Sequence, residues 1–253
     1  MNRIMAAIAV AGAAATASAQ TQPYYITDGD ASTMFIVQNG SLQATKATYN
    51  LGYPIAVRNT IWLGHRDDAG AFEYDLFGDA TGGSSAGGNG FSQLLDGATG
   101  IANNYGIECC GGPNSVTIAD PDWSNQKVLF NLPGGAEGVG IAYATSTNTL
   151  FAMFFFEMTV NEYDLNGTLL NRWNYQDQFE AALAYEASTN TLWTAQNSGN
   201  IIRQYALDGT PLQTITVAGL GNFGNIWGGE MQIPAPGSLA LVAAGGLMFR
   251  RRR

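Results

Sequence analysis

Charged residues, histidine and cysteine are all scarce in this sequence. Its 253 residues include one histidine and two cysteines, and only 12% are charged. A single histidine excludes metal centres that need several histidine ligands. The two cysteines, Cys109 and Cys110, are neighbours whose Cα atoms lie about 3.8 Å apart, below the usual disulfide range. The sequence therefore provides neither a disulfide framework nor a C-x-x-C redox motif.

Basic residues are especially rare in the body of the chain. All 20 acidic residues lie between 20 and 232, where only six basic residues accompany them. Because a surface this acidic repels phosphate groups, the composition excludes nucleic acid as a partner. Glycine, asparagine, threonine and aromatic residues are plentiful instead, which is typical of an extracellular β-rich protein.

The apolar segment at the start of the chain is too short to favour a membrane span. Arg3 precedes an apolar run from Ile4 to Ala15, and Ala17-Ser18-Ala19 forms an A-x-A cleavage pattern. This order of charge, apolar core and small residues predicts a secretory signal over residues 1–19, with signal peptidase cutting before Gln20.

The end of the chain, residues 233–253, carries a second short apolar segment. Pro234-Ala235-Pro236 is followed by a 12-residue stretch from Ser238 to Phe249, which is shorter than the ~20 residues of an independent membrane helix. Four arginines, Arg250, Arg251, Arg252 and Arg253, end the chain and favour the cytoplasmic side of a membrane. The segment resembles the PEP-CTERM sorting tails of exosortase systems, with alanine in place of their usual glutamate. This resemblance implies transient membrane contact, processing by an exosortase, and delivery to the cell surface or extracellular matrix of a bacterium. A simple tail anchor is the alternative.

A repeat of 42 residues organises the region between the two ends. The stretch from Ala142 to Phe151 recurs from Ala184 to Trp193, and both copies contain Ser-Thr-Asn-Thr-Leu. A third copy is recognisable because in all three an aromatic residue precedes a tyrosine by 12 positions: Trp62 and Tyr74, Phe151 and Tyr163, Trp193 and Tyr205. Each copy divides into four short β-like runs separated by turn residues, which is the size of a propeller blade.

These copies predict an all-β fold in which residues 20–232 form a single β-propeller with five four-stranded blades. Two weaker copies, one near the start of this region and one from about Gly97 to Pro133, complete the count. The first copy lacks an innermost strand, and the segment Gly224–Gly228 is a spare one. Pairing them would close the ring and remove exposed sheet edges. Six blades, or an open array, is the alternative.

Residues 136–217 resemble the bacterial propeller repeats of the NHL, gluconolactonase-like and related families. The resemblance lies in the Ala-Tyr…Thr-Asn-Thr-Leu-aromatic segments and in the later Tyr-x-Leu-(Asn/Asp)-Gly segments. It implies a fold rather than an activity, because propellers host many unrelated functions.

Three carboxylates are candidate binding residues at the mouth of the propeller channel. Glu137 and Glu180 precede the innermost strands of neighbouring blades, and Glu230 follows the strand expected to close the ring. Facing carboxylates can bind calcium or act as an acid–base pair on a glycosidic bond. The alternative is that each glutamate binds turn amides or bridges two blades. We assign no catalytic residues from the sequence.

A short acidic turn and an aromatic run complete the candidates. Asp28 and Asp30 offer hard oxygen ligands, so calcium is the one cofactor left open, although their spacing is not that of an EF-hand. A solvated turn is the alternative. The run Phe154-Phe155-Phe156 is expected to form a buried strand, with an exposed apolar patch as its alternative.

Together these features predict an exported, non-catalytic surface or matrix protein. Its propeller is expected to bind polysaccharide, protein or a small ligand, and PEP-CTERM tails suggest exopolysaccharide by analogy. The alternative is an extracellular hydrolase or lyase that acts on sugars or lactones through carboxylates at the channel mouth. A propeller that acts only as a passive spacer is a further alternative.

Overall fold

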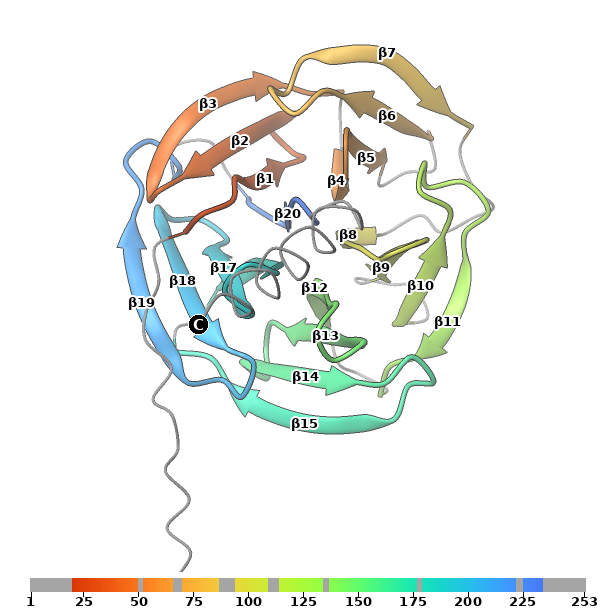
Figure 1. Ribbon diagram of the computed structural model, residues 1–253, viewed down its shortest axis with the longest axis vertical. Helices are drawn as coiled ribbons and strands as arrows, with labels where there is room; N and C mark the ends of the chain where they lie inside the picture. The colour runs from red at the N-terminus through yellow and green to blue at the C-terminus, as the bar shows by residue number, and fades with distance from the viewer. Residues whose placement is uncertain are drawn as a thin grey trace, which may run out of the picture.

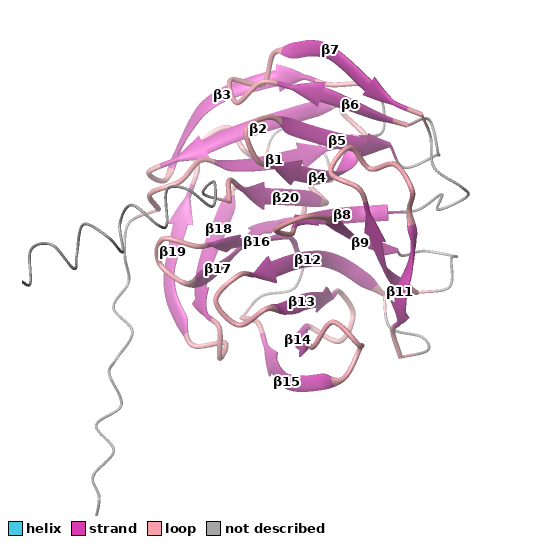
Figure 2. Cartoon of the chain, turned by 45° about the vertical axis from the view of Figure 1, so that its right-hand side comes forward, coloured by secondary structure: helices cyan, strands magenta, loops and turns pink. Residues whose placement is uncertain are grey.

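A computed structural model describes residues 20–49, 52–65, 70–86, 94–108, 114–133, 137–176, 179–221 and 225–233. The expected signal, the expected sorting tail and both cysteines lie outside these ranges. The described residues form five four-stranded antiparallel sheets around a central axis, which confirms the five-bladed propeller (Figure 1). Every regular element among them is a strand (Figure 2), and no helix in this part could cross a bilayer.

The blades follow one another in chain order, except that blade A combines both ends of the propeller. From the axis outward, blade A consists of β20 (Gly228–Met231), β1 (Tyr24–Asp28), β2 (Thr33–Gln38) and β3 (Ser41–Ala47). Blade B consists of β4 (Gly52–Val57), β5 (Ile61–His65), β6 (Ala71–Tyr74) and β7 (Ala80–Ser85). Blade C consists of β8 (Leu94–Thr99), β9 (Asn104–Glu108), β10 (Ser115–Ala119) and β11 (Lys127–Asn131). Blade D consists of β12 (Gly138–Ala144), β13 (Thr149–Phe154), β14 (Thr159–Tyr163) and β15 (Leu169–Asn174). Blade E consists of β16 (Glu180–Glu186), β17 (Thr191–Gln196), β18 (Ile201–Ala206) and β19 (Pro211–Thr216).

The repeated residues form the same turn in blades D and E. The Tyr143 hydroxyl donates to the Asn148 side-chain oxygen at 2.6 Å, and the Tyr185 hydroxyl donates to that of Asn190 at 2.9 Å. Asn148 and Asn190 have φ of 58° and 56°, a left-handed conformation that asparagine tolerates better than most residues. The repeat is therefore a tyrosine that holds the asparagine of the turn between the first two strands.

The ring closes by pairing of a C-terminal strand with the N-terminal blade, as expected, but that strand, β20, lies later in the chain than the sequence suggested. β20 pairs with β1, so that Gly228 lies opposite Thr27 and Met231 opposite Tyr24. The predicted closing strand, Gly224–Gly228, was placed too early. Ile226 and Trp227 instead precede the strand, and their N–H groups donate to the carbonyls of Asn197 and Thr27.

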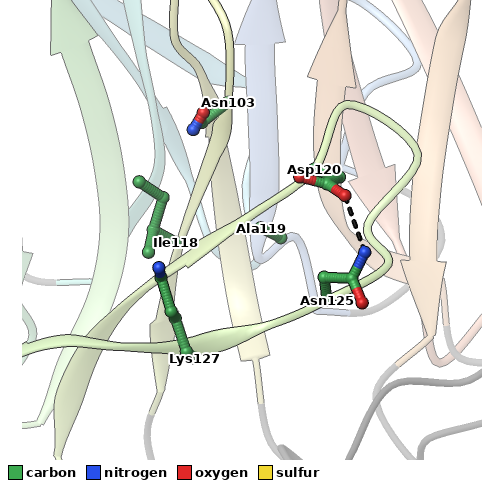
Figure 3. Close-up of a pocket in the computed structure, with 6 residues that line it drawn as sticks. All are labelled: Asn103, Ile118, Ala119, Asp120, Asn125 and Lys127. Atoms are coloured by element: carbon green, nitrogen blue, oxygen red, sulfur yellow. Dashed lines mark hydrogen bonds between the residues drawn. The ribbon is translucent and has the colours of Figure 1, made fainter.

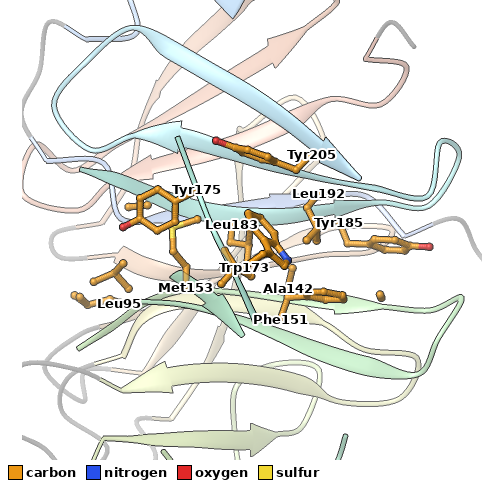
Figure 4. Packing of buried hydrophobic residues seen from close by; sticks show 14 of the residues in the cluster. Leu95, Ala142, Phe151, Met153, Trp173, Tyr175, Leu183, Tyr185, Leu192 and Tyr205 are labelled. Carbon is orange, nitrogen blue, oxygen red and sulfur yellow. The ribbon is translucent and has the colours of Figure 1, made fainter. Parts of the chain in front are cut away.

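The core lies between the blades, where large side chains from neighbouring sheets interlock. Between blades D and E, Phe151 and Met153 of one sheet pack against Leu183 and Leu192 of the other (Figure 4). Burial of such side chains from water is the main stabilising contribution to the fold. Because each blade needs a neighbour to cover its faces, the rigid unit is the closed ring.

Candidate functional site

The five innermost strands run in the same direction, which gives the propeller two distinct faces. Each four-stranded meander returns the chain to the end at which it entered, so β4, β8, β12, β16 and β20 all begin at one end of the channel. We call this end the top face. The described loops that follow β1, β13, β15, β17 and β19 lie there, and the turn between the first two strands of blade D or E lies at the bottom face.

Asp96 of β8, a residue that the sequence analysis missed, is fully buried and contacts the inner strands of other blades. Its Oδ1 accepts the N–H groups of Gly97 and Gly229, both at 2.8 Å. Its Oδ2 accepts those of Ile141 and Leu183, both at 3.0 Å. Burial raises the pKa of Asp96 well above its usual range, against the opposing effect of these donors. One buried carboxylate therefore ties together the inner strands of blades A, C, D and E.

Glu230 of β20 lies in the same buried region. Its carboxylate accepts the N–H groups of Thr99 at 2.5 Å and Met231 at 2.8 Å. Burial raises its pKa to about 8, opposed by those hydrogen bonds and by the charge of Arg58. The Arg58 guanidinium is in turn held by Asn104 and by two carbonyls of the turn between β8 and β9. Glu230 is thus part of the channel wall, inside β20 rather than after it.

Glu180 is the first residue of β16 and is fully buried within blade E. It forms an ion pair with Arg203 at 2.7 Å, and accepts hydrogen bonds from Thr194 at 2.6 Å and from Tyr205 at 3.0 Å. Burial raises its pKa, and these partners oppose the rise. Glu180 therefore binds strands of its own blade to one another.

Glu137 directly precedes β12 and is partly exposed at the top face. Its carbonyl accepts the N–H of Phe155 at 3.1 Å. In the part of the chain that the structure describes, no three acidic, histidine or cysteine side chains come together as metal ligands. The role of Glu137, Glu180 and Glu230 in ligand binding remains a prediction.

The acidic turn after β1 lies at the top face. Asp28 is fully buried, its Oδ1 accepts the N–H of Ala31 at 2.9 Å, and burial raises its pKa. Asp30 is exposed and accepts hydrogen bonds from Tyr53 and from Asn225, the latter at 3.4 Å. Asp30 thus connects the turn to the segment that leads into β20, and calcium binding there remains a prediction.

The top face also carries four aromatic side chains, which we call the aromatic platform: Phe155, Phe156, Phe179 and Trp227. The ring of Phe155 lies at the centre, with its centroid 5.6 Å from Phe156, 5.4 Å from Phe179 and 5.9 Å from Trp227. Phe156 and Phe179 are 71% and 53% exposed. The expectation of a buried Phe154–Phe156 strand was wrong after Phe154, because β13 ends there and the chain turns.

A pocket of about 250 Å³ adjoins the platform and is lined by Phe179, Gln196 and Ser198. The Ser198 hydroxyl also donates to the Asn225 side chain at 3.2 Å, which continues the polar edge toward Asp30. The lining therefore combines an aromatic ring with an uncharged amide and a hydroxyl group.

A second pocket, of about 190 Å³, lies on blade C near the bottom face. Figure 3 shows Lys127 beside Ile118, with a separate hydrogen bond of 2.8 Å between Asn125 and Asp120. Its lining contains one acidic and one basic side chain and no exposed aromatic residue. The top face therefore carries the stronger candidate site.

No protein-family model matches the sequence, and no curated protein matches it. Among solved structures, the chain is similar to a chain of a nidogen/laminin complex, with 9% identity and a TM-score of 0.57 over 84% of this chain and 98% of that one. It is also similar to a structural-genomics protein of unknown function from Bacteroides thetaiotaomicron VPI-5482, with 12% identity and a TM-score of 0.54 over 83% of this chain and 64% of that one. At such low identity these similarities establish the β-propeller fold alone.

Proposed function

We propose that this protein is an exported, non-catalytic propeller that binds polysaccharide at the cell surface or in the extracellular matrix of a bacterium. The observation that carries the proposal is the burial of the two inner-strand acids, Asp96 and Glu230. Their carboxylate oxygens accept hydrogen bonds from backbone N–H groups and are not exposed to solvent. The proposed binding surface is therefore formed by the top-face loops, where apolar and uncharged polar groups are exposed. The secretory pattern at residues 1–19 and the tail at residues 233–253 support export and sorting by an exosortase.

The second candidate is an extracellular hydrolase or lyase that acts on sugars or lactones, and one observation favours it. The pKa of Glu230, about 8, is in the range of a general acid at neutral pH. Glu230 is only 2% exposed, however, so a substrate would need the channel to open. Residues 83–87 also spell G-x-S-x-G, but Ser85 lies within β7 and donates to the Asp122 carbonyl at 2.6 Å. A nucleophile elbow instead places its serine at a turn from a strand to a helix.

Binding and cleavage are separated by one experiment on the purified full chain. The protein is mixed with extracellular polysaccharide isolated from the cells that produce it, and we measure co-sedimentation together with the release of new sugar ends. Binding without release supports the proposal, and release that is lost in Glu230→Gln supports the hydrolase. Absence of binding contradicts the proposal. The mass of the protein recovered from those cells tests export, because removal of both signals would leave a chain that begins at Gln20 and lacks the terminal arginines.

A further inference from the structure

We infer that the aromatic platform and its pocket form a binding site for an uncharged polysaccharide, with sugar rings of the polymer stacked on Phe179 and on Phe156. This inference rests on the proposed function and specifies its ligand and its residues. The apolar C–H face of a sugar ring suits the electron-rich face of an aromatic ring. Its hydroxyl groups suit the amide of Gln196 and the hydroxyl of Ser198, which line the adjacent pocket.

The exposure of the platform is the first argument. Phe156 and Phe179 expose more than half of their surface, whereas Phe155 and Trp227 are partly buried against the core. The ring of Phe155 contacts both exposed rings and joins them to the core. A cluster of exposed aromatic rings on a rigid scaffold is typical of an interaction surface.

The backbone of Phe179 supplies an independent argument. Its φ is 69°, a left-handed conformation that is unfavourable for a bulky residue, and its carbonyl accepts the N–H of Asn197 at 2.6 Å. Glycine would adopt this conformation without strain. Because the ring is exposed, packing contributes little to offset this strain. Strained backbone conformations are common at ligand-binding sites. The need to present the ring to a ligand explains why phenylalanine stands here.

The charges around the platform determine which polysaccharide it can bind. The described top-face loops at residues 28–33, 155–158, 196–200, 217–221 and 225–227 contain no lysine or arginine. Their charged members include Glu157 beside Phe156 and Asp30 beside Asn225. An anionic sugar polymer would be repelled and would find no basic partner there. The pocket is smaller than a typical drug-sized site and has room for a single sugar unit, so the rest of the polymer would lie across the open face.

The test is a calorimetric titration of the full chain with uncharged hexasaccharides of glucose, xylose and N-acetylglucosamine, with polygalacturonate as the anionic probe. We expect at least one uncharged hexasaccharide to bind and polygalacturonate not to bind. Phe156→Ser and Phe179→Gly are each expected to weaken binding about tenfold or more. Phe179→Gly removes the ring while suiting the positive φ, so it keeps the protein folded. Phe77→Ser is the matched control, because Phe77 is 76% exposed in the turn between β6 and β7.

Each outcome separates the inference from the proposed function. If the producing cells' polysaccharide binds equally to the natural chain and to both platform variants, the polysaccharide function stands and this site is wrong. If no uncharged hexasaccharide binds, or only polygalacturonate binds, the inference is overturned. Binding of choline alone would also overturn it and would identify the platform as a cage for quaternary ammonium groups. If neither the hexasaccharides nor the native polysaccharide bind, both proposals fail.

Discussion

The pKa of Glu230 makes the stability of the propeller depend on pH. Burial raises this pKa from its ordinary 4.5 to about 8, so between those values the native state keeps a proton that the unfolded state has released. The contribution of this residue to stability is therefore complete below about pH 4.5 and is lost as the pH rises through about 8. Within this window each pH unit costs about 1.4 kcal/mol, which amounts to about 3 kcal/mol from pH 5 to pH 7.

Glu230→Gln isolates this effect, because it keeps the shape of the side chain and removes its titration. From pH 5 to pH 7 the free energy of unfolding should change in favour of the variant by about 3 kcal/mol, or ~6–12 °C in midpoint for a chain of this size. Guanidinium unfolding, followed by tryptophan fluorescence at several pH values, measures the difference. Glu157→Gln makes the same change at an exposed position and is the matched control for the loss of one carboxylate. Curves for Glu230→Gln that stay parallel to those of the natural chain at every pH would refute the reasoning.

Three further predictions concern buried charge and backbone strain. Arg203→Met should lower the free energy of unfolding by about 3–5 kcal/mol, because it leaves Glu180 buried without its cation. The double variant Arg203→Met/Glu180→Gln should recover most of that loss in the same denaturation assay, and no recovery would mean that the ion pair is not the cause. Asp96→Leu leaves four buried N–H groups without their acceptor and should lower the free energy of unfolding by more than about 4 kcal/mol. A thermal midpoint close to that of the natural chain would contradict the stabilising role of Asp96. Phe179→Gly should have a free energy of unfolding about 1 kcal/mol higher than that of Phe179→Ala, because only glycine adopts a φ of 69° without strain. Its thermal midpoint should therefore also be higher. The reverse order would argue against strain at this position.

The fold was predictable because the repeated residues form the same turns and strand pairs in each blade. The tyrosine and asparagine of each turn, and the fixed spacing from an aromatic residue to a tyrosine, recur wherever a blade repeats the same strand pairing. The inner strands of the weaker blades were harder to place. β20 reads Gly-Gly-Glu-Met and has little intrinsic β-propensity, so its position is set by pairing with β1. β8 starts at Leu94, three residues before the predicted blade, and contains Asp96 within an apolar run.

The candidate site was less predictable, since a carboxylate's role depends on the side of the strand from which it projects. Glu180 and Asp96 both lie in innermost strands. Glu180 binds side chains of its own blade, whereas Asp96 binds amides of three other blades. No spacing in the sequence separates these two outcomes. An exposed patch at the run of three phenylalanines was only the alternative expectation, because the sequence does not show where β13 ends.

The pairing of β1 with β20 also sets the order in which the molecule can be completed. Thr27 pairs with Gly228, some two hundred positions later in the chain, so the inner edge of β1 has no partner until β20 is in place. In a chain that is synthesised or exported from its N-terminus, this strand edge would therefore stay unpaired until nearly the whole chain has emerged. Such an edge invites association with other chains, and contacts between distant positions form slowly. The last step of folding is then the arrival of the final strand, which brings Gly229 to Asp96 and fixes four blades at once.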